Sequence, residues 1–198
     1  MDSPQQVNLL SCENVSKAFG ERPLLRDVSL GVSKGERIGV VGRNGAGKST
    51  LLRVLAGAEP PNSGRVTRGA SVVVGELDQV GTSAEHATIR SHVLGDRDEH
   101  DWAGDSAVRE ILTALLGGFQ SEQLDRRISD LSGGERRRAY LAEQLIREVD
   151  VLFLDEPTNH LDVEIIAWLA AHLKGRPKIA IVTVTHDRWF LDEVCDHM

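Results

Sequence analysis

The eight residues Gly42-Arg43-Asn44-Gly45-Ala46-Gly47-Lys48-Ser49 follow the pattern G-x-x-x-x-G-K-[ST] of a phosphate-binding loop. Glycines let the backbone curl so that several N–H groups converge on a phosphate, and a helix that starts here adds the positive end of its dipole. An apolar run, Ile38–Val41, precedes the loop, and a helical pattern from Thr50 follows it. This strand–loop–helix context favours a P-loop over a chance glycine turn.

In a P-loop, the lysine reaches the outer phosphates of a nucleotide and the following hydroxyl ligates Mg²⁺. These roles fall on Lys48 and Ser49. We therefore predict that the phosphates of a nucleotide and Mg²⁺ are bound here. The predicted nucleotide contacts from this stretch are Gly42, Asn44, Gly45, Ala46, Gly47, Lys48, Ser49 and Thr50.

The segments around the loop alternate between strand and helix patterns, which predicts an α/β fold with a parallel sheet and covering helices. Strands are expected at 7–12, 26–32, 38–41, 65–67, 71–77, 151–155 and 178–184. Helices are expected at 50–56, 88–94, 105–116, 131–147, 163–174 and from about Asp187. Residues 95–104 (GDRDEHDWAG) are predicted to form an exposed loop.

Composition limits the alternatives. The chain has 198 residues, 40% of them apolar and 27% charged, which suits one folded domain. Its net charge of −7 argues against a uniformly basic nucleic-acid surface, although several arginines cluster between 126 and 138. No apolar run approaches the roughly 20 residues that span a bilayer, and the N-terminus lacks a signal-peptide pattern. Two cysteines form no disulfide framework, so a cytoplasmic location is expected.

A second motif is the apolar strand Val151–Leu154, which ends in Asp155 and Glu156. Strands of α/β sheets carry their ligands at their carboxyl ends. Asp155 is therefore predicted to hold Mg²⁺ through water, and Glu156 to orient and deprotonate the attacking water. Two acids after a strand are weak evidence alone, but they follow a P-loop by about a hundred residues, as in the Walker B pattern.

The third motif is Leu131-Ser132-Gly133-Gly134-Glu135. Ser132 and Glu135 have the spacing of a capping box at a helix start. The two glycines would also expose main-chain N–H groups to an anion, so that Ser132, Gly133 and Gly134 could bind a γ-phosphate. The structural and the functional interpretation can hold together.

The order of these motifs along the chain resembles that of the ATP-binding cassette (ABC) proteins: the P-loop comes first, then LSGGE, and then the strand that ends in Asp-Glu. The resemblance covers nearly the whole chain. It implies a P-loop NTPase of the ABC nucleotide-binding type, a mixed sheet core with an antiparallel β subdomain and an inserted helical subdomain. The catalytic core is expected at 7–79 and 131–198, and the helical subdomain at 80–130. In this family LSGGE completes the ATP site of an opposite cassette in a head-to-tail dimer.

Further site residues follow from the resemblance alone. Gln79 resembles the Q-loop glutamine that contacts Mg²⁺ and water, and Asp162 the D-loop aspartate that touches the partner cassette. His186 resembles the switch histidine that binds the γ-phosphate. Phe19 resembles the aromatic residue that stacks on adenine, although tyrosine is commoner there and a core phenylalanine would look the same. A lone cassette is expected to bind ATP and to hydrolyse it poorly.

Three stretches resemble the ABC-F branch, whose members carry two cassettes and act on the ribosome: LDEPTNHLD at 154–162, THDRWFLD at 185–192 and LSGGERRR at 131–138. This implies an ATPase module of a translation factor that binds ribosome and transfer RNA. The chain would be the first cassette of a longer protein, truncated at its C-terminus; a homodimer is the other source of a second cassette. The alternatives are the ATP-binding subunit of a membrane transporter and a DNA-repair cassette.

Overall fold

A computed structural model describes residues 7–20, 22–77 and 87–198. The described residues divide into two compact units. The first contains residues 7–20, 22–77, 149–157 and 172–198, and the second contains residues 87–148 and 158–171. The core and helical subdomain boundaries expected from the sequence remain predictions.

A four-stranded parallel sheet forms the centre of the first unit. Its strands lie in the order β3 (Arg37–Gly39), β7 (Ala180–Val184), β6 (Val151–Asp155) and β5 (Val74–Leu77). Every residue of β6 and β7 is buried, which explains their continuous apolar sequence. The predicted β6 has the observed bounds, whereas β7 begins two residues later than expected.

An antiparallel sheet of order β2-β1-β4 completes the strands of this unit, with β1 at Asn8–Phe19, β2 at Arg22–Ser33 and β4 at Ser63–Arg68. Both β1 and β2 are longer than predicted, because they continue through irregularities where Asn14 and Asp27 adopt φ values of 48° and 49°. The Ser16 hydroxyl bridges this region: it accepts from the Asp27 N–H and donates to the Asp27 carboxylate. Strands β1 and β2 stay paired although the alternation of apolar and polar residues along them is interrupted.

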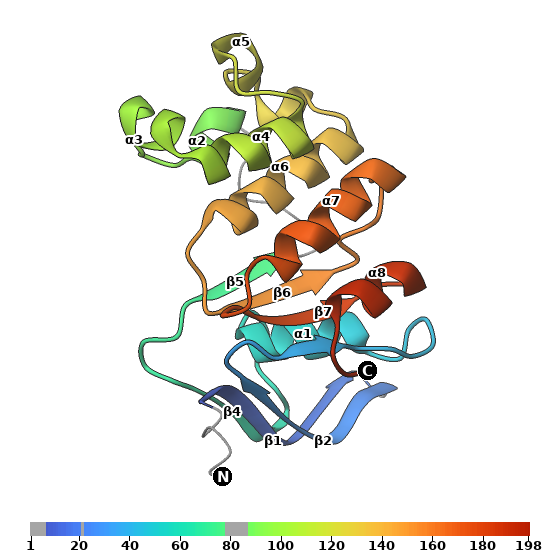
Figure 1. Cartoon of the computed structure of the whole chain (residues 1–198). Helices are drawn as coiled ribbons and strands as arrows, with labels where there is room; N and C mark the ends of the chain where they lie inside the picture. The colour runs from blue at the N-terminus through green and yellow to red at the C-terminus, as the bar shows by residue number, and fades with distance from the viewer. Residues whose placement is uncertain (1–6, 21, 78–86) are drawn as a thin grey trace. The chain divides into compact units, whose positions relative to one another are not determined.

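Helix α1 (Lys48–Ala56) lies between the two sheets (Figure 1). Its buried residues Leu51, Leu52, Val54 and Leu55 share one apolar core with the inner residues of both sheets. Gly57 ends the helix in the left-handed conformation, as the sequence predicts. Helix α8 (Arg188–Val194) begins after Asp187, whose side chain caps it by accepting from the Phe190 N–H.

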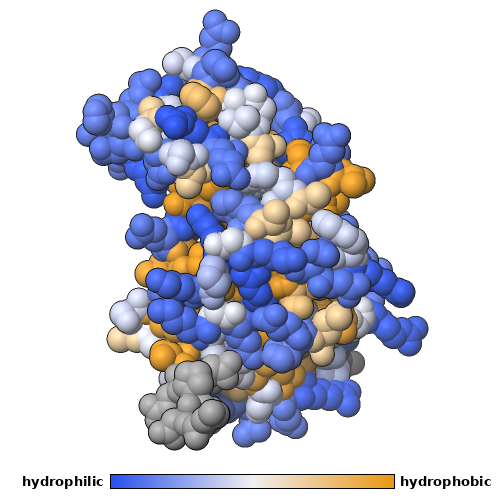
Figure 2. Space-filling view, viewed as in Figure 1, coloured by the Kyte–Doolittle hydropathy of each residue, from blue (hydrophilic) through white to orange (hydrophobic). Residues whose placement is uncertain are grey.

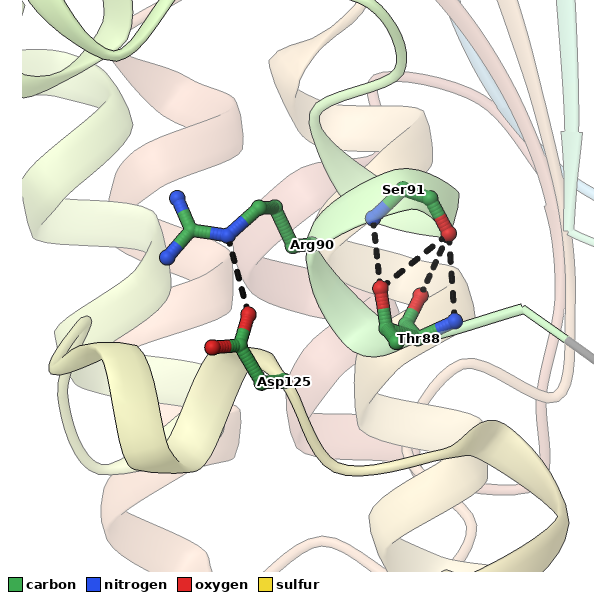
Figure 3. Close-up of polar contacts among 4 residues, drawn as sticks. All are labelled: Thr88, Arg90, Ser91 and Asp125. Carbon is green, nitrogen blue, oxygen red and sulfur yellow. Dashed lines mark hydrogen bonds and ion pairs between the residues drawn. The ribbon is translucent and has the colours of Figure 1, made fainter.

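The elements of the second unit are helices and one 3₁₀ turn, among the described residues. The unit contains α2 (Ile89–Val93), α3 (Glu99–Gly104), α4 (Ser106–Leu116), α5 (Ser121–Leu124), a 3₁₀ turn (Ile128–Asp130), α6 (Gly133–Ile146) and most of α7 (Val163–Lys174). Thr88 and Ser91 form a reciprocal capping box at the start of α2, and Arg90 pairs with Asp125 after α5 at 3.1 Å (Figure 3). Helix α6 packs against α4 and α2.

The prediction of a loop at 95–104 is wrong for the second half of this segment, which forms α3. The reason is Trp102, whose side chain is only 4% exposed and meets the Phe119 ring edge-on at 6.5 Å. The Arg90 guanidinium lies 5.7 Å from the centre of the indole. Burial of one tryptophan stabilises a turn of helix in a segment whose polar composition indicates a loop.

Among the described residues, no helix is long and apolar enough to cross a bilayer. On the face drawn in Figure 2, hydrophilic residues predominate and apolar ones form small patches.

Candidate nucleotide-binding site

The predicted P-loop forms a tight turn that ends in α1. Gly47 caps the helix in the left-handed conformation with φ 95°, and its carbonyl accepts the first helical hydrogen bond from Leu51 at 2.8 Å. A Cβ at this position would lie 2.9 Å from the Leu24 carbonyl oxygen. Residues 42–46 are exposed, so the main chain of the loop is accessible to a ligand. Only glycine fits at 47, because both the dihedral angle and the close strand exclude a side chain.

Lys48 folds back over this loop. Its ammonium donates to the carbonyls of Gly42 and Arg43 at 2.9 and 3.1 Å. The cation therefore lies over the loop whose N–H groups would hold the phosphates. Positive charge, main-chain N–H groups and a helix N-terminus together form an anion site.

Two carboxylates, those of Asp155 and Glu156, lie at the carboxyl end of β6. Asp155 is 4% exposed and Glu156 7% exposed, both far below the usual exposure of acids. Glu156 has φ 51°, a rare conformation for a long side chain, and its N–H donates to Val184 of β7 at 2.7 Å. Backbone strain of this kind is concentrated at functional sites, where the surrounding structure enforces it.

His186 lies beside Glu156. The His186 main-chain N–H donates to Oε2 of Glu156 at 3.4 Å, and Nε2 of the ring lies 3.4 Å from Oε1. The two side chains differ in access, since the imidazole is 61% exposed and the carboxylate 9%. An exposed imidazole held by a buried carboxylate can offer a proton donor to a ligand.

Hydrogen bonds of three neighbouring residues, Thr183, Thr185 and Asp187, fix the backbone around His186, and of these the sequence gives no signal for Thr183. The Thr185 hydroxyl accepts from the Asp187 N–H at 3.1 Å, while Asp187 caps α8. Thr183, fully buried in β7, donates to the Leu154 carbonyl of β6 at 3.2 Å. A threonine in a strand carries no signal of its own, and only the pairing of β6 with β7 reveals the contact of Thr183 with Leu154.

Phe19 ends β1 and is 54% exposed, which excludes the core-phenylalanine alternative. The Lys17 ammonium lies 5.3 Å from the ring centre and is itself held by Glu59 at 3.0 Å and by the Pro60 carbonyl at 2.7 Å. The ring is therefore an ordered, accessible apolar surface, suited to stacking on a base.

The donor set of this unit fits Mg²⁺. Ser49 supplies a hydroxyl in the first turn of α1, and Asp155 supplies a buried carboxylate at the end of β6. Mg²⁺ prefers oxygen ligands and is held by one or two carboxylates with phosphates and water. Gln79, the third predicted ligand, lies outside the described residues.

The LSGGE stretch begins α6 in the second unit, and its predicted capping box is confirmed. The Ser132 hydroxyl accepts from the Glu135 N–H at 3.3 Å, and the Glu135 carboxylate accepts from the Ser132 N–H at 2.9 Å. Arg126 adds an ion pair to Glu135 at 2.9 Å. The bonds from Ser132 and Arg126 lower the pKa of Glu135 from 4.5 to about 2.

Beyond the cap, the glycines differ in what surrounds them. A Cβ on Gly133 would meet nothing within 4 Å, whereas one on Gly134 would touch Cβ of His160 at 3.6 Å. In the same unit, Asp162 accepts from the Ile165 N–H at 2.9 Å and so caps α7. Packing among the described residues therefore does not explain why residue 133 is glycine.

The predicted site residues thus fall into two groups. Phe19, the P-loop, Asp155, Glu156 and His186 belong to the first unit, and Ser132, Gly133, Gly134 and Asp162 to the second. The first group lies in one compact unit, and its roles in nucleotide binding and water activation remain predictions.

Comparisons with known proteins point to the same chemistry. The family model described as "ABC transporter" matches residues 25–159. The energy-dependent translational throttle protein EttA of Haemophilus influenzae is 40% identical over 96% of this chain. EttA of Escherichia coli is 39% identical over 96% of the chain, and EttA of Mycobacterium tuberculosis 36% over 95%. The chain spans 34%, 34% and 39% of these three relatives, so they are about two and a half to three times as long as the part matched.

Solved structures of other proteins have the same fold as this chain. An archaeal ribosome recycling factor, solved with a ribosomal stalk protein, superposes with a TM-score of 0.79 at 26% identity over 99% of this chain and 37% of that one. An ATP-binding subunit of an ABC transporter gives a TM-score of 0.79 at 21% identity over 95% of this chain and 83% of that one, which shows the fold alone.

Proposed function

Because the chain belongs to the ABC transporter family, we propose that it binds ATP with Mg²⁺ and hydrolyses the γ-phosphate bond when a second cassette closes over the site. The observation that carries the proposal is the first unit itself. It joins a preformed P-loop, with Lys48 over its carbonyls, to the buried Glu156 carboxylate held by His186.

Each residue has a role that follows from its surroundings. The P-loop N–H groups and Lys48 hold the phosphates, and Phe19 stacks on adenine. Glu156 is a largely buried acceptor, and it orients the attacking water and takes its proton. The exposed His186 ring donates a hydrogen bond to the γ-phosphate oxygens, where charge accumulates in phosphoryl transfer. Bound by Ser49, Asp155 and Gln79, Mg²⁺ would neutralise phosphate charge.

The second unit supplies the complementary surface to another cassette. Ser132 and Gly133 are exposed at the start of α6, a helix of fourteen residues whose free N–H groups attract an anion. Gly133 faces open space, so a phosphate could approach the main chain closely. Asp162, exposed at the start of α7, would touch the partner cassette. This arrangement makes hydrolysis depend on two cassettes in one protein or in a homodimer.

We propose further that the complete protein acts on the ribosome during translation, with ATP controlling its binding and release. The support comes from relatives. Proteins that are 36% to 40% identical to this chain are named translational throttle proteins, and a structural neighbour is a ribosome recycling factor. ATP binding would favour the closed, ribosome-bound state, and hydrolysis would reopen it.

The test is co-sedimentation of the complete Glu156→Gln protein with ribosomes, with and without ATP. The matched control adds Lys48→Ala, which removes the cation over the P-loop. We expect ATP-dependent association of Glu156→Gln and its loss in the double variant. ATP binding without any ribosome association would instead favour a transporter subunit.

A further inference from the structure

The end of the β1–β2 pair presents two residues to the nucleotide site. Phe19 and Arg22 are direct partners in the antiparallel register. Side chains directly opposite each other in such a pair lie on the same face of the sheet. The exposed Phe19 ring and the Arg22 side chain therefore share one face, at the strand end from which Arg22 reaches the P-loop.

Arg22 contacts the P-loop itself. Its Nη2 donates to the Gly45 carbonyl oxygen at 3.3 Å, across 23 residues of sequence. Gly45 has φ 73°, and a Cβ on it would lie 3.3 Å from the same Nη2. The guanidinium thus lies against the turn whose N–H groups would hold the phosphates.

The contact leaves most of the guanidinium available. It has five N–H donors, and among the described residues it uses one of them, in the bond to Gly45. Arg22 is exposed, so a ligand in the loop can reach it. Together with Lys48 it brings two cations to a single turn. Planar guanidinium groups bind phosphate oxygens strongly because they donate two parallel hydrogen bonds.

We propose that Arg22 is a second cationic contact for the phosphates of the nucleotide and approaches them from the β1–β2 side. This inference rests on the proposed ATP site. In this arrangement Phe19 holds the base and Arg22 the neighbouring phosphates. The hairpin end would distinguish nucleoside di- and triphosphates from the nucleoside. Lys48 approaches the same phosphates from α1.

The test measures the dissociation constants of ATP, ADP and adenosine for Arg22→Gln and Arg22→Lys, by competition with a fluorescent ADP. Glutamine keeps an N–H donor for the Gly45 carbonyl but has no charge, whereas lysine keeps the charge. We expect Arg22→Gln to weaken ATP and ADP about tenfold, as for loss of a charge-assisted hydrogen bond. Adenosine affinity should stay unchanged, and Arg22→Lys should retain most of the affinity for ATP.

Arg26→Gln is the matched control, since Arg26 is another exposed arginine on β2. It should bind all three ligands as the unaltered chain does. Two results would overturn the proposal: wild-type ATP affinity in Arg22→Gln, or an equal loss for adenosine and ATP, which would mean that Arg22 supports the base site and not the phosphates. Lys48→Ala separates the two proposals. If it also binds ATP normally, the P-loop assignment itself is wrong; if it loses ATP while Arg22→Gln does not, only the role of Arg22 is wrong.

Discussion

Glu156 and His186 hold each other at two points, through the His186 main-chain N–H and through its ring, each 3.4 Å from a different carboxylate oxygen. Thirty residues separate them in sequence. They meet because β6 and β7 are parallel neighbours, with Asp155 opposite Val184 in the register. The strained φ of Glu156 turns its side chain out of the strand at this point. The carboxylate that we assign to water activation is therefore oriented before a ligand binds.

Replacing Glu156 by glutamine removes the base and preserves the size of the side chain. In a protein with two cassettes, we expect hydrolysis to fall at least about a hundredfold, the usual contribution of a general base. ATP affinity should be unchanged, because the P-loop is untouched. Phosphate release and retention of radiolabelled ATP measure the two effects. Wild-type hydrolysis in this variant would show that another group activates the water.

Replacing Lys48 by alanine removes the cation that bridges Gly42 and Arg43. We expect ATP and ADP affinity to fall about tenfold or more, since a charged hydrogen-bond donor to the phosphates is lost. Isothermal titration calorimetry measures the change. Lys34→Ala, at an exposed position, removes the same charge elsewhere and should bind nucleotides normally. Equal affinities in the two variants would contradict the P-loop assignment.

Alanine at two glycines should separate folding from function. Gly47→Ala puts a Cβ 2.9 Å from the Leu24 carbonyl at φ 95°, and we expect a loss of about 1–3 kcal/mol in unfolding free energy. The Cβ added by Gly133→Ala would meet nothing within 4 Å, and residue 133 is the first residue of α6, where alanine is a good helix former. The unfolding free energy of this variant should therefore be preserved. In a two-cassette protein, however, Gly133→Ala should reduce ATP hydrolysis severalfold by crowding the opposing phosphate. Urea unfolding and phosphate release test the pair. Normal hydrolysis would argue against a phosphate contact at Gly133.

The capping box predicts a pH dependence of stability. Hydrogen bonds from Ser132 and Arg126 lower the pKa of Glu135 from 4.5 to about 2 in the folded chain. A group with a lowered folded pKa contributes stability that is complete above 4.5 and is lost as the pH falls towards 2. Glutamine keeps the capping geometry without the charge. The unfolding free energy of the unaltered chain should therefore exceed that of Glu135→Gln at pH 7, and the difference should shrink by pH 3. A difference independent of pH would contradict the shift.

Much of the site could be predicted because its signals are local. The P-loop glycines, the Ser132–Glu135 box and the apolar β6 each depend on dihedral angles or contacts within a few residues, and the structure contains all three. Helix α3 was missed because Trp102 is buried against residues distant in sequence, and no local pattern indicates that burial.

Local sequence thus specified the turns, the helix caps and the order of the motifs, from which the ABC family could be identified. Tertiary structure decided which of these groups meet. The pairing of β6 with β7 brings Glu156 to His186, and the register of β1 with β2 brings Arg22 to the Gly45 carbonyl. Strand pairing and register depend on burial across the whole sheet, so a single stretch of sequence does not contain this information.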